Sequence, residues 1–203
     1  RSIQAARKKV AGGGEMVNEV IINHLRSLGY DVEELNSQFV TPEIIRSTDA
    51  FFIVGNFIGL DKLSKQQLQA TDYIIIEHDH KYLRTRDPSP WEENDYIAPP
   101  DQVINKSFYE SARAVFCQSQ LHSQILSDNL MISNVVNFGC SLWSDEQMAA
   151  IKKHANKDKT KSFGILESTN EIKGNLQSKH ICETRGFEYE MIPSCEFEEL
   201  KQL

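Results

Sequence analysis

Long apolar runs are missing from this sequence. No stretch approaches the roughly 20 apolar residues that a membrane-spanning helix requires, and the polar N-terminus lacks the apolar segment of a signal peptide. We therefore expect no transmembrane segment and a cytoplasmic location. Of the 203 residues, 40% are hydrophobic and 25% are charged. This composition is typical of a globular protein with a buried core.

Paired cysteine motifs and clusters of basic residues are also lacking. The four cysteines, Cys117, Cys140, Cys182 and Cys195, show neither C-x-x-C pairing nor the spacing of a zinc site, so we expect free thiols and no disulfide framework. The 29 acidic residues outnumber the 22 basic ones and give a net charge of -7. Because binding to nucleic-acid phosphates needs clustered Lys and Arg, nucleic acid is not an expected partner.

The sequence does contain short apolar segments that alternate with amphipathic ones. The apolar segments predict strands at residues 30–35, 50–54, 73–76, 114–117, 134–138, 163–166 and 189–192. Helical spacing predicts helices at residues 16–28, 42–46, 63–70, 103–112, 121–130, 175–184 and 197–203. This alternation favours an α/β fold with a Rossmann-like parallel sheet and helices on both of its faces.

A polar, lysine-rich segment at residues 154–161 divides this pattern. We expect a Rossmann-like domain over residues 1–153, a linker over 154–161 and the beginning of a second Rossmann-like domain over 162–203. One β–α–β unit cannot bury both faces of its sheet, so we expect the second domain to be truncated. Residues 1–10 are too polar for a buried strand, and we expect the first strand to be missing or replaced.

A glycine-rich turn precedes the first predicted helix. Gly12, Gly13 and Gly14 are followed by Glu15. Glycine allows positive φ angles and close approach of a ligand, and a helix start directs unpaired N–H groups at whatever lies there. The turn therefore favours a phosphate or sugar cradle, although it is neither a Walker loop nor G-x-G-x-x-G. A flexible linker into a capped helix is the alternative.

Four polar residues follow the apolar run at 73–76: Glu77, His78, Asp79 and His80. Ligands of open α/β sheets gather at the carboxyl edge of the strands. Hydrogen bonding or acid–base chemistry fits these side chains, whereas a metal site lacks a third ligand at a sensible spacing. In the alternative interpretation they simply end the strand and bond to the next loop.

The segment 81–100 has no clear period and is predicted to be a long structured loop. Arg84 and Arg86 are candidates for gripping an anionic group, and Tyr82 or Trp91 for stacking on a sugar ring. The alternative is that these side chains pin the loop to the domain by ion pairs and packing.

Taken in order, these segments resemble GT-B glycosyltransferases of the broad retaining, family-four-like group, which use nucleotide-sugar donors. Residues 12–19 (GGGEMVNE) resemble the N-terminal loop of that family, and His78-Asp79 resembles its strand-ending His, which faces the donor sugar. Residues 114–126 (AVFCQSQLHSQIL) are similar to its strand–Ser–helix segment. Residues 163–174 resemble the opening of the donor domain, where a Gly-Arg pair and a later Lys-Gly grip the diphosphate. Glu167-Ser168 stands where Gly-Arg is expected.

The resemblance implies an acceptor-side domain, the start of a donor-binding domain, and sugar transfer from a nucleotide sugar to a hydroxyl of a glycan or another acceptor. It implies a catalytic role for His78, no metal, and no cofactor besides the nucleotide-sugar co-substrate. The implied substrate-binding residues are Gly12, Gly13, Gly14, Glu15, Asp79, Arg84, Ser119, Lys173 and Gly174. Because the donor domain is truncated, we expect weak or no transfer by this chain.

Two other classes of function stay open. One is a non-catalytic α/β domain that binds a ligand or partner through the loop with Trp91, and it predicts an exposed aromatic patch there. The other is a sugar-nucleotide epimerase of the same fold. One fold hosts many activities, so the fold does not choose among them.

Overall fold

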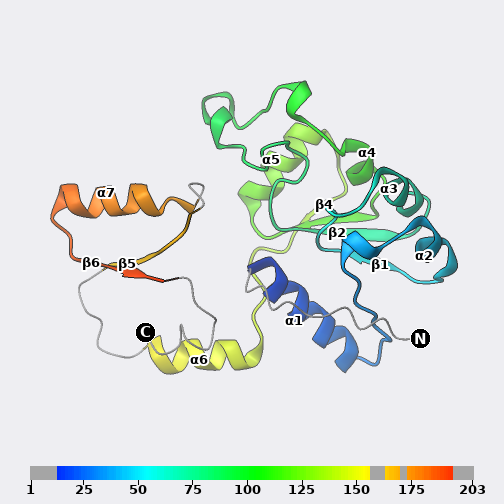
Figure 1. Cartoon of the computed structure of the whole chain (residues 1–203), viewed down its shortest axis with the longest axis horizontal. Coiled ribbons are helices and arrows are strands. Elements are labelled where there is room, and N and C mark those ends of the chain that lie inside the picture. Colours follow the sequence, from blue (N-terminus) through cyan, green and yellow to red (C-terminus); the bar gives the residue numbers. More distant parts are fainter. Residues whose placement is uncertain (1–12, 156–162, 170–172, 194–203) are drawn as a thin grey trace. The chain divides into compact units, whose positions relative to one another are not determined.

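The computed structural model describes residues 13–155, 163–169 and 173–193 (Figure 1). The chain divides into two compact units, Arg1–Leu142 and Trp143–Leu203. A parallel sheet of four strands lies in the first unit and one of two strands in the second, so the predicted α/β class is confirmed. Gly12, the segment 1–10, most of the expected linker and the helix predicted at 197–203 lie outside the described residues.

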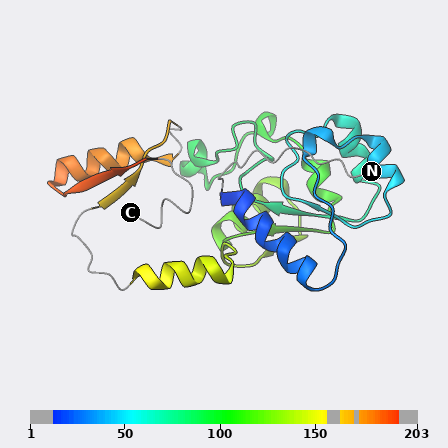
Figure 2. The ribbon, with the colours of Figure 1, turned by 60° about the horizontal axis from the view of Figure 1, so that its bottom comes forward.

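The first sheet has the strand order β1-β2-β3-β4. Its strands are β1 (Phe52–Val54), β2 (Tyr73–Glu77), β3 (Ala114–Cys117) and β4 (Val135–Asn137). Parallel neighbours need a crossover connection, and the crossovers carry α3 (Lys62–Leu68), α4 (Lys106–Glu110) and α5 (Gln120–Leu130). Right-handed crossovers that all advance in one direction place their helices on one face. Figures 1 and 2 show these three helices on one side of the sheet and α1 (Gly13–Ser27) on the other.

Short polar side chains and a glycine set the helix ends. The helix α1 ends before Gly29, whose φ of +88° is a left-handed conformation that glycine adopts without strain. The helix α2 (Pro42–Ser47) begins after Thr41, whose hydroxyl accepts a hydrogen bond from the Ile44 N–H at 3.4 Å. Both helix ends thus follow from residue types that are visible in the local sequence.

The core lies between the sheet and the crossover helices. Tyr73 and Ile75 point into it from β2, and both are fully buried. The ring of Phe108 on α4 stacks on Tyr73 with centroids 5.0 Å apart and packs against Phe57 at 4.9 Å. The Tyr73 hydroxyl also donates a hydrogen bond to the Phe108 carbonyl oxygen. This aromatic cluster fixes α4 beneath β2.

Two predicted elements are wrong in type or extent. Residues 30–35 form no strand: Tyr30 and Leu35 are 63% and 40% exposed, so the segment has no buried face for a sheet to cover. The helix predicted at 103–112 spans only Lys106–Glu110, because Asn105 before it takes a left-handed φ of +57°.

The loop between β2 and α4 is held by backbone pairing and short 3-10 turns. The Ile104 N–H donates to the Tyr82 carbonyl oxygen at 2.7 Å, and Leu83 forms an antiparallel bridge with Val103. The loop contains the 3-10 turns η2 (Ser89–Asn94) and η3 (Pro100–Gln102). Another 3-10 turn, η1 (Ser37–Phe39), precedes α2. The prediction of a long structured loop is confirmed.

The second unit contains α6 (Asp145–Ala155), β5 (Phe163–Leu166), α7 (Asn175–Arg185) and β6 (Tyr189–Ile192). The strands β5 and β6 pair in parallel, with Phe163 opposite Tyr189. Both strands and α7 were predicted, and Gly186 ends α7 with a φ of +67°. In the part of the chain that the structure describes, no helix is long and apolar enough to cross a membrane.

Replacing Phe108 with Ala should lower the free energy of unfolding by about 3–5 kcal/mol, because it leaves a cavity among buried rings. The matched control is Phe39→Ala, since Phe39 is 54% exposed and should change stability by less than about 1 kcal/mol. Urea denaturation followed by circular dichroism measures both. Equal losses in the two variants would contradict the described core.

Candidate functional site

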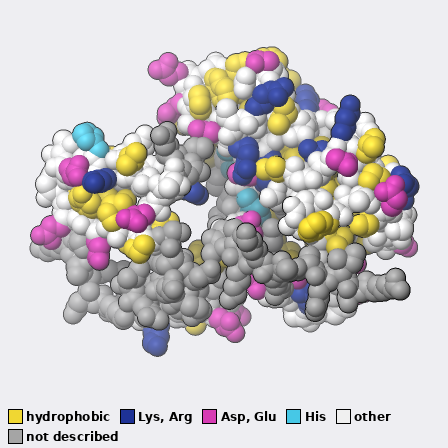
Figure 3. All heavy atoms as spheres, viewed as in Figure 1, with side chains coloured by type: hydrophobic (Ala, Val, Ile, Leu, Met, Phe, Trp, Pro, Cys, Tyr) yellow, Lys and Arg dark blue, Asp and Glu magenta, His cyan; other side chains and the backbone are white. Residues whose placement is uncertain are grey.

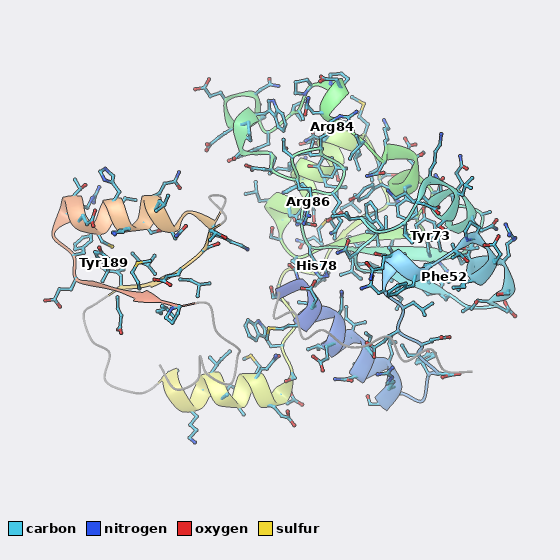
Figure 4. All side chains as sticks on the ribbon, in the orientation of Figure 1. Phe52, Tyr73, His78, Arg84, Arg86 and Tyr189 are labelled. Atoms are coloured by element: carbon cyan, nitrogen blue, oxygen red, sulfur yellow. The ribbon has the colours of Figure 1, made fainter. Side chains whose placement is uncertain are left out.

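The carboxyl edge of the first sheet carries the candidate site. Three elements end or begin there: the first turn of α1, the loop that follows β2, and the first turn of α5 after β3. Figure 4 shows His78 beside the first turn of α1. In this view Arg86 lies between His78 and Arg84. In parallel α/β sheets this edge is where ligands bind.

Two glycines let α1 approach the sheet closely. A Cβ on Gly14 would lie 3.1 Å from Cδ2 of His78, and a Cβ on Gly55 would lie 2.5 Å from Nδ2 of Asn18. Asn18 Oδ1 in turn lies 3.0 Å from His78 Nε2, within hydrogen-bond distance. The imidazole of His78 is therefore held between the glycine turn and the side chain of Asn18.

A buried ion pair lies beneath His78. Glu77 is fully buried, and its Oε1 accepts hydrogen bonds from Lys81 Nζ at 2.8 Å and from the Asp79 N–H at 3.0 Å. Its Oε2 accepts a hydrogen bond from the Tyr109 hydroxyl. Burial raises the pKa of Glu77, and the Lys81 ammonium and the hydrogen bonds from Lys81 and Tyr109 oppose that rise. This network fixes the first residues after β2.

The same lysine continues the network toward the surface. Lys81 Nζ lies 2.5 Å from Asp79 Oδ1, and the other carboxylate oxygen of Asp79 pairs with the Arg86 guanidinium. Arg86 takes a left-handed φ of +59°, which costs a non-glycine residue about 1–3 kcal/mol. The ion pair with Asp79 helps to offset that cost. Both cations near His78 are therefore engaged by carboxylates.

Two further histidines stand next to this network. The rings of His80 and His122 lie 4.4 Å apart between centroids, and His80 Nδ1 is 3.0 Å from the Tyr82 hydroxyl. His122 is in the first turn of α5, where its N–H donates to the Ser119 hydroxyl at 3.1 Å. His122 was not predicted as a site residue, because it lies 42 positions after His80 and no local pattern links the two.

Burial keeps all three imidazoles neutral at ordinary pH. It lowers the pKa of His78 to about 4, helped by the Lys81 charge and opposed by Glu15. It lowers the pKa of His80 to about 4, opposed by Asp87. The pKa of His122 falls to about 3, through burial first and then through His80, Lys81 and His78. Each ring therefore offers one donor and one acceptor nitrogen.

The site differs from a metal centre and from a deep cavity. Within the described ranges, no group of three or more His, Cys, Asp or Glu is placed to hold a metal ion. Two shallow hollows of about 270 and 210 Å³ lie between α2 and α3 and along α5 and β4, and none of the three imidazoles lines either one. Figure 3 shows acidic and basic side chains interspersed over the first unit.

The structure brings together part of the predicted site. Gly14, Glu15, His78 and Asp79 meet at the edge of the sheet, and Gly13 begins α1 beside them. Ser119 caps α5, and its hydroxyl accepts a hydrogen bond from the backbone N–H of His122.

Two residues of the long loop lie in other surroundings. The Arg84 guanidinium donates to the Asp101 carbonyl oxygen at 2.8 Å and stays on the exposed loop. Trp91 is partly buried and packs against the core, so the aromatic patch expected around it is absent from the described surface.

Lys173 and Gly174 belong to the second unit. Gly174 precedes α7 with a left-handed φ of +69°, and Lys173 is exposed beside it. The Asn175 side chain donates to the Ser168 carbonyl oxygen at 3.0 Å and so ties the loop after β5 to the helix start. Lys173 thus lies just before the N-cap of α7, on the exposed surface of the second unit.

Comparisons with protein-family models, with curated proteins and with solved structures find no match to this chain.

Replacing Lys81 with Met should lower the free energy of unfolding by about 3–5 kcal/mol, because it leaves the Glu77 charge buried without a counter-ion. The double variant Glu77→Gln/Lys81→Met should recover much of this loss. The control is Lys106→Met, whose partner Glu110 lies at 3.7 Å on the surface and which should cost less than about 1 kcal/mol. Chemical denaturation measures all three, and a double variant no more stable than Lys81→Met would contradict the pairing.

Acidification should destabilise the first unit between pH 6.5 and about 4. In this window the unfolded histidines bind protons while the folded ones, with lowered pKa values, do not. Each such group lowers the free energy of unfolding by up to about 1.4 kcal/mol per pH unit. Replacing His80 with Gln should make the slope shallower, as urea titrations at several pH values would show. An unchanged slope would mean that His80 is not held neutral.

Proposed function

We propose that the first unit is the acceptor-side domain of a glycosyltransferase that uses a nucleotide-sugar donor. The observation that carries the proposal is the packing of the first turn of α1, at Gly14, against His78 at the carboxyl edge of a parallel sheet. This edge of such folds binds ligands. A neutral imidazole beside a helix start offers hydrogen bonds to sugar hydroxyls without needing a metal ion.

In this proposal, the bond between the anomeric carbon and the donor diphosphate breaks, and a bond from that carbon to the acceptor oxygen forms. The acceptor proton leaves with the departing diphosphate or passes to solvent. His78 contacts the sugar, and Asn18 and Gly14 hold its ring in place. Orientation of the acceptor hydroxyl supplies much of the rate.

A separate part of the proposal concerns the second unit. Lys173 and the N–H groups at the start of α7 would contact the donor diphosphate, since an ammonium and a helix N-terminus both favour anions. Stabilising the leaving-group charge is a large contribution to catalysis of this kind.

A second candidate is a non-catalytic domain that binds a sugar-containing ligand. It is favoured by the pairing of both carboxylates next to His78, since Glu77 and Asp79 are each engaged by cations. It predicts donor or glycan binding with no release of nucleoside diphosphate. Product analysis after incubation with donor and acceptor separates the two candidates.

Saturation-transfer NMR against UDP-, GDP-, ADP- and dTDP-sugars tests the proposal. We expect at least one donor to bind, and we expect His78→Ala and Lys173→Ala each to weaken that binding by about tenfold, which is the loss of one good hydrogen bond or ion pair. The controls are His24→Ala and Lys152→Ala, whose side chains are exposed elsewhere in the same two units. Silence from every donor, or equal binding by all variants, would contradict it.

A further inference from the structure

The strand β4 lies at one end of the first sheet and has an open side. In the described part of the chain it pairs with β3 alone. The Asn134 carbonyl oxygen and the Phe138 N–H bond to β3, so the backbone groups of Val135 and Asn137, which alternate with them, point to the open side. An edge of this kind is a template for pairing with another strand.

The sequence of β4 does nothing to keep a second strand away. Natural edge strands are often protected by charged side chains or by proline, whereas residues 134–138 read Asn-Val-Val-Asn-Phe. Val136 is 40% exposed and lies opposite Phe116 in the register with β3, so both side chains are on the same face of the sheet. The edge therefore offers apolar contact as well as free backbone groups.

The surface beside β4 is almost free of charge. A hollow of about 210 Å³ lies along α5 and β4, and uncharged side chains line it: Gln120, Ser123, Gln124, Ser127, Val135 and Asn137. Neither element carries Lys or Arg. The single acid of α5 is Asp128, whose carboxylate oxygens accept hydrogen bonds from Gln124 Nε2 at 2.8 and 2.9 Å. Charge attraction therefore does not select the partner of this edge.

These groups are complementary to an identical set. Amide and hydroxyl side chains both donate and accept hydrogen bonds, and two strands related by a two-fold axis pair through the same residues of each copy. The chain has a net charge of -7, so two copies repel each other in most orientations. Contact through an uncharged edge minimises that repulsion, which favours a second copy of this chain as the occupant.

We propose that two copies of this chain associate through β4 and form one continuous sheet, with four strands from each copy. The two copies of β4 run antiparallel, and Val135 exchanges main-chain hydrogen bonds with the partner's Asn137. Val136 lies opposite the partner's Val136 in a non-hydrogen-bonded pair, whose Cα atoms are about 4.5 Å apart, so the two side chains touch. The pairing uses none of the residues around His78 and goes beyond the proposed function.

Sedimentation velocity of the 203-residue chain, from micromolar to about millimolar concentration, tests the proposal. We expect a species of twice the 23.2 kDa mass of one chain to grow with concentration. Val136→Lys sets two like charges against each other at the two-fold axis and should raise the dimer Kd about a hundredfold. Its circular dichroism and urea unfolding should stay unchanged, because the side chain is exposed in the single copy.

The matched control is Ile53→Lys. Ile53 is 41% exposed on β1, the strand at the other end of the same sheet, and its replacement should leave the dimer Kd unchanged. A chain that stays single at every concentration would overturn the proposal. The same holds for a dimer that tolerates Val136→Lys or that Ile53→Lys weakens equally.

A charge exchange tests the two-fold pairing itself. Val136→Glu alone should also be a single chain, since two carboxylates then meet at the axis. An equimolar mixture of Val136→Lys and Val136→Glu should regain the dimer, because opposite charges directly across two strands attract each other. A mixture that remains as single chains would contradict the placement of Val136 at the axis.

Discussion

The carboxylate of Glu77 is fully buried at the end of β2, and the edge of the first sheet is arranged around its neutralisation. An isolated charge at this depth would be prohibitively costly. Lys81, four residues later, supplies the counter-charge, and Tyr109 of α4 supplies a hydrogen bond from the core. Because Lys81 must turn back to reach Glu77, the chain after β2 bends over the edge of the sheet. The position of His78, Asp79 and His80 follows from that bend.

Side chains along β2 alternate between the two faces of the sheet, so core residues lie on one face and the candidate site residue His78 on the other. Tyr73, Ile75 and Glu77 face the crossover helices, where rings and the ion pair fill the core. The next residue, His78, faces α1, and its ring meets Asn18 and Gly14. A shift of one residue in the register would exchange these roles and bury the imidazole beside Tyr109. The buried acid thus sets the register that presents the imidazole to the edge.

Local patterns predict much of this fold, and long-range pairing accounts for the rest. The segments at 114–117, 163–166 and 189–192 are strands with the predicted bounds, and the first of them is a continuous apolar run that has few alternatives to a covered strand. Residues 30–35 (YDVEEL) carry three acidic side chains among six and form no strand, so the strand predicted there was wrong. The site divides in the same way. Its residues after β2 are visible from position, whereas the partnership of Glu77 with Tyr109, 32 residues away, and of His80 with His122 exists only in the folded chain.

Neutral histidines beside paired charges favour recognition of uncharged groups at this edge. Burial disfavours the imidazolium form, and Lys81 disfavours it further for all three rings. Burial is the main cause of the neutral imidazoles, and the lysine that neutralises Glu77 adds to it, so that the interior ion pair and the neutral state of the histidines share one ammonium group. Loss of Lys81 would leave the acid without its counter-ion and would take from the imidazoles a positive neighbour that adds to the effect of burial. The stability of the first unit and the chemistry of its edge are thus coupled through a single buried side chain.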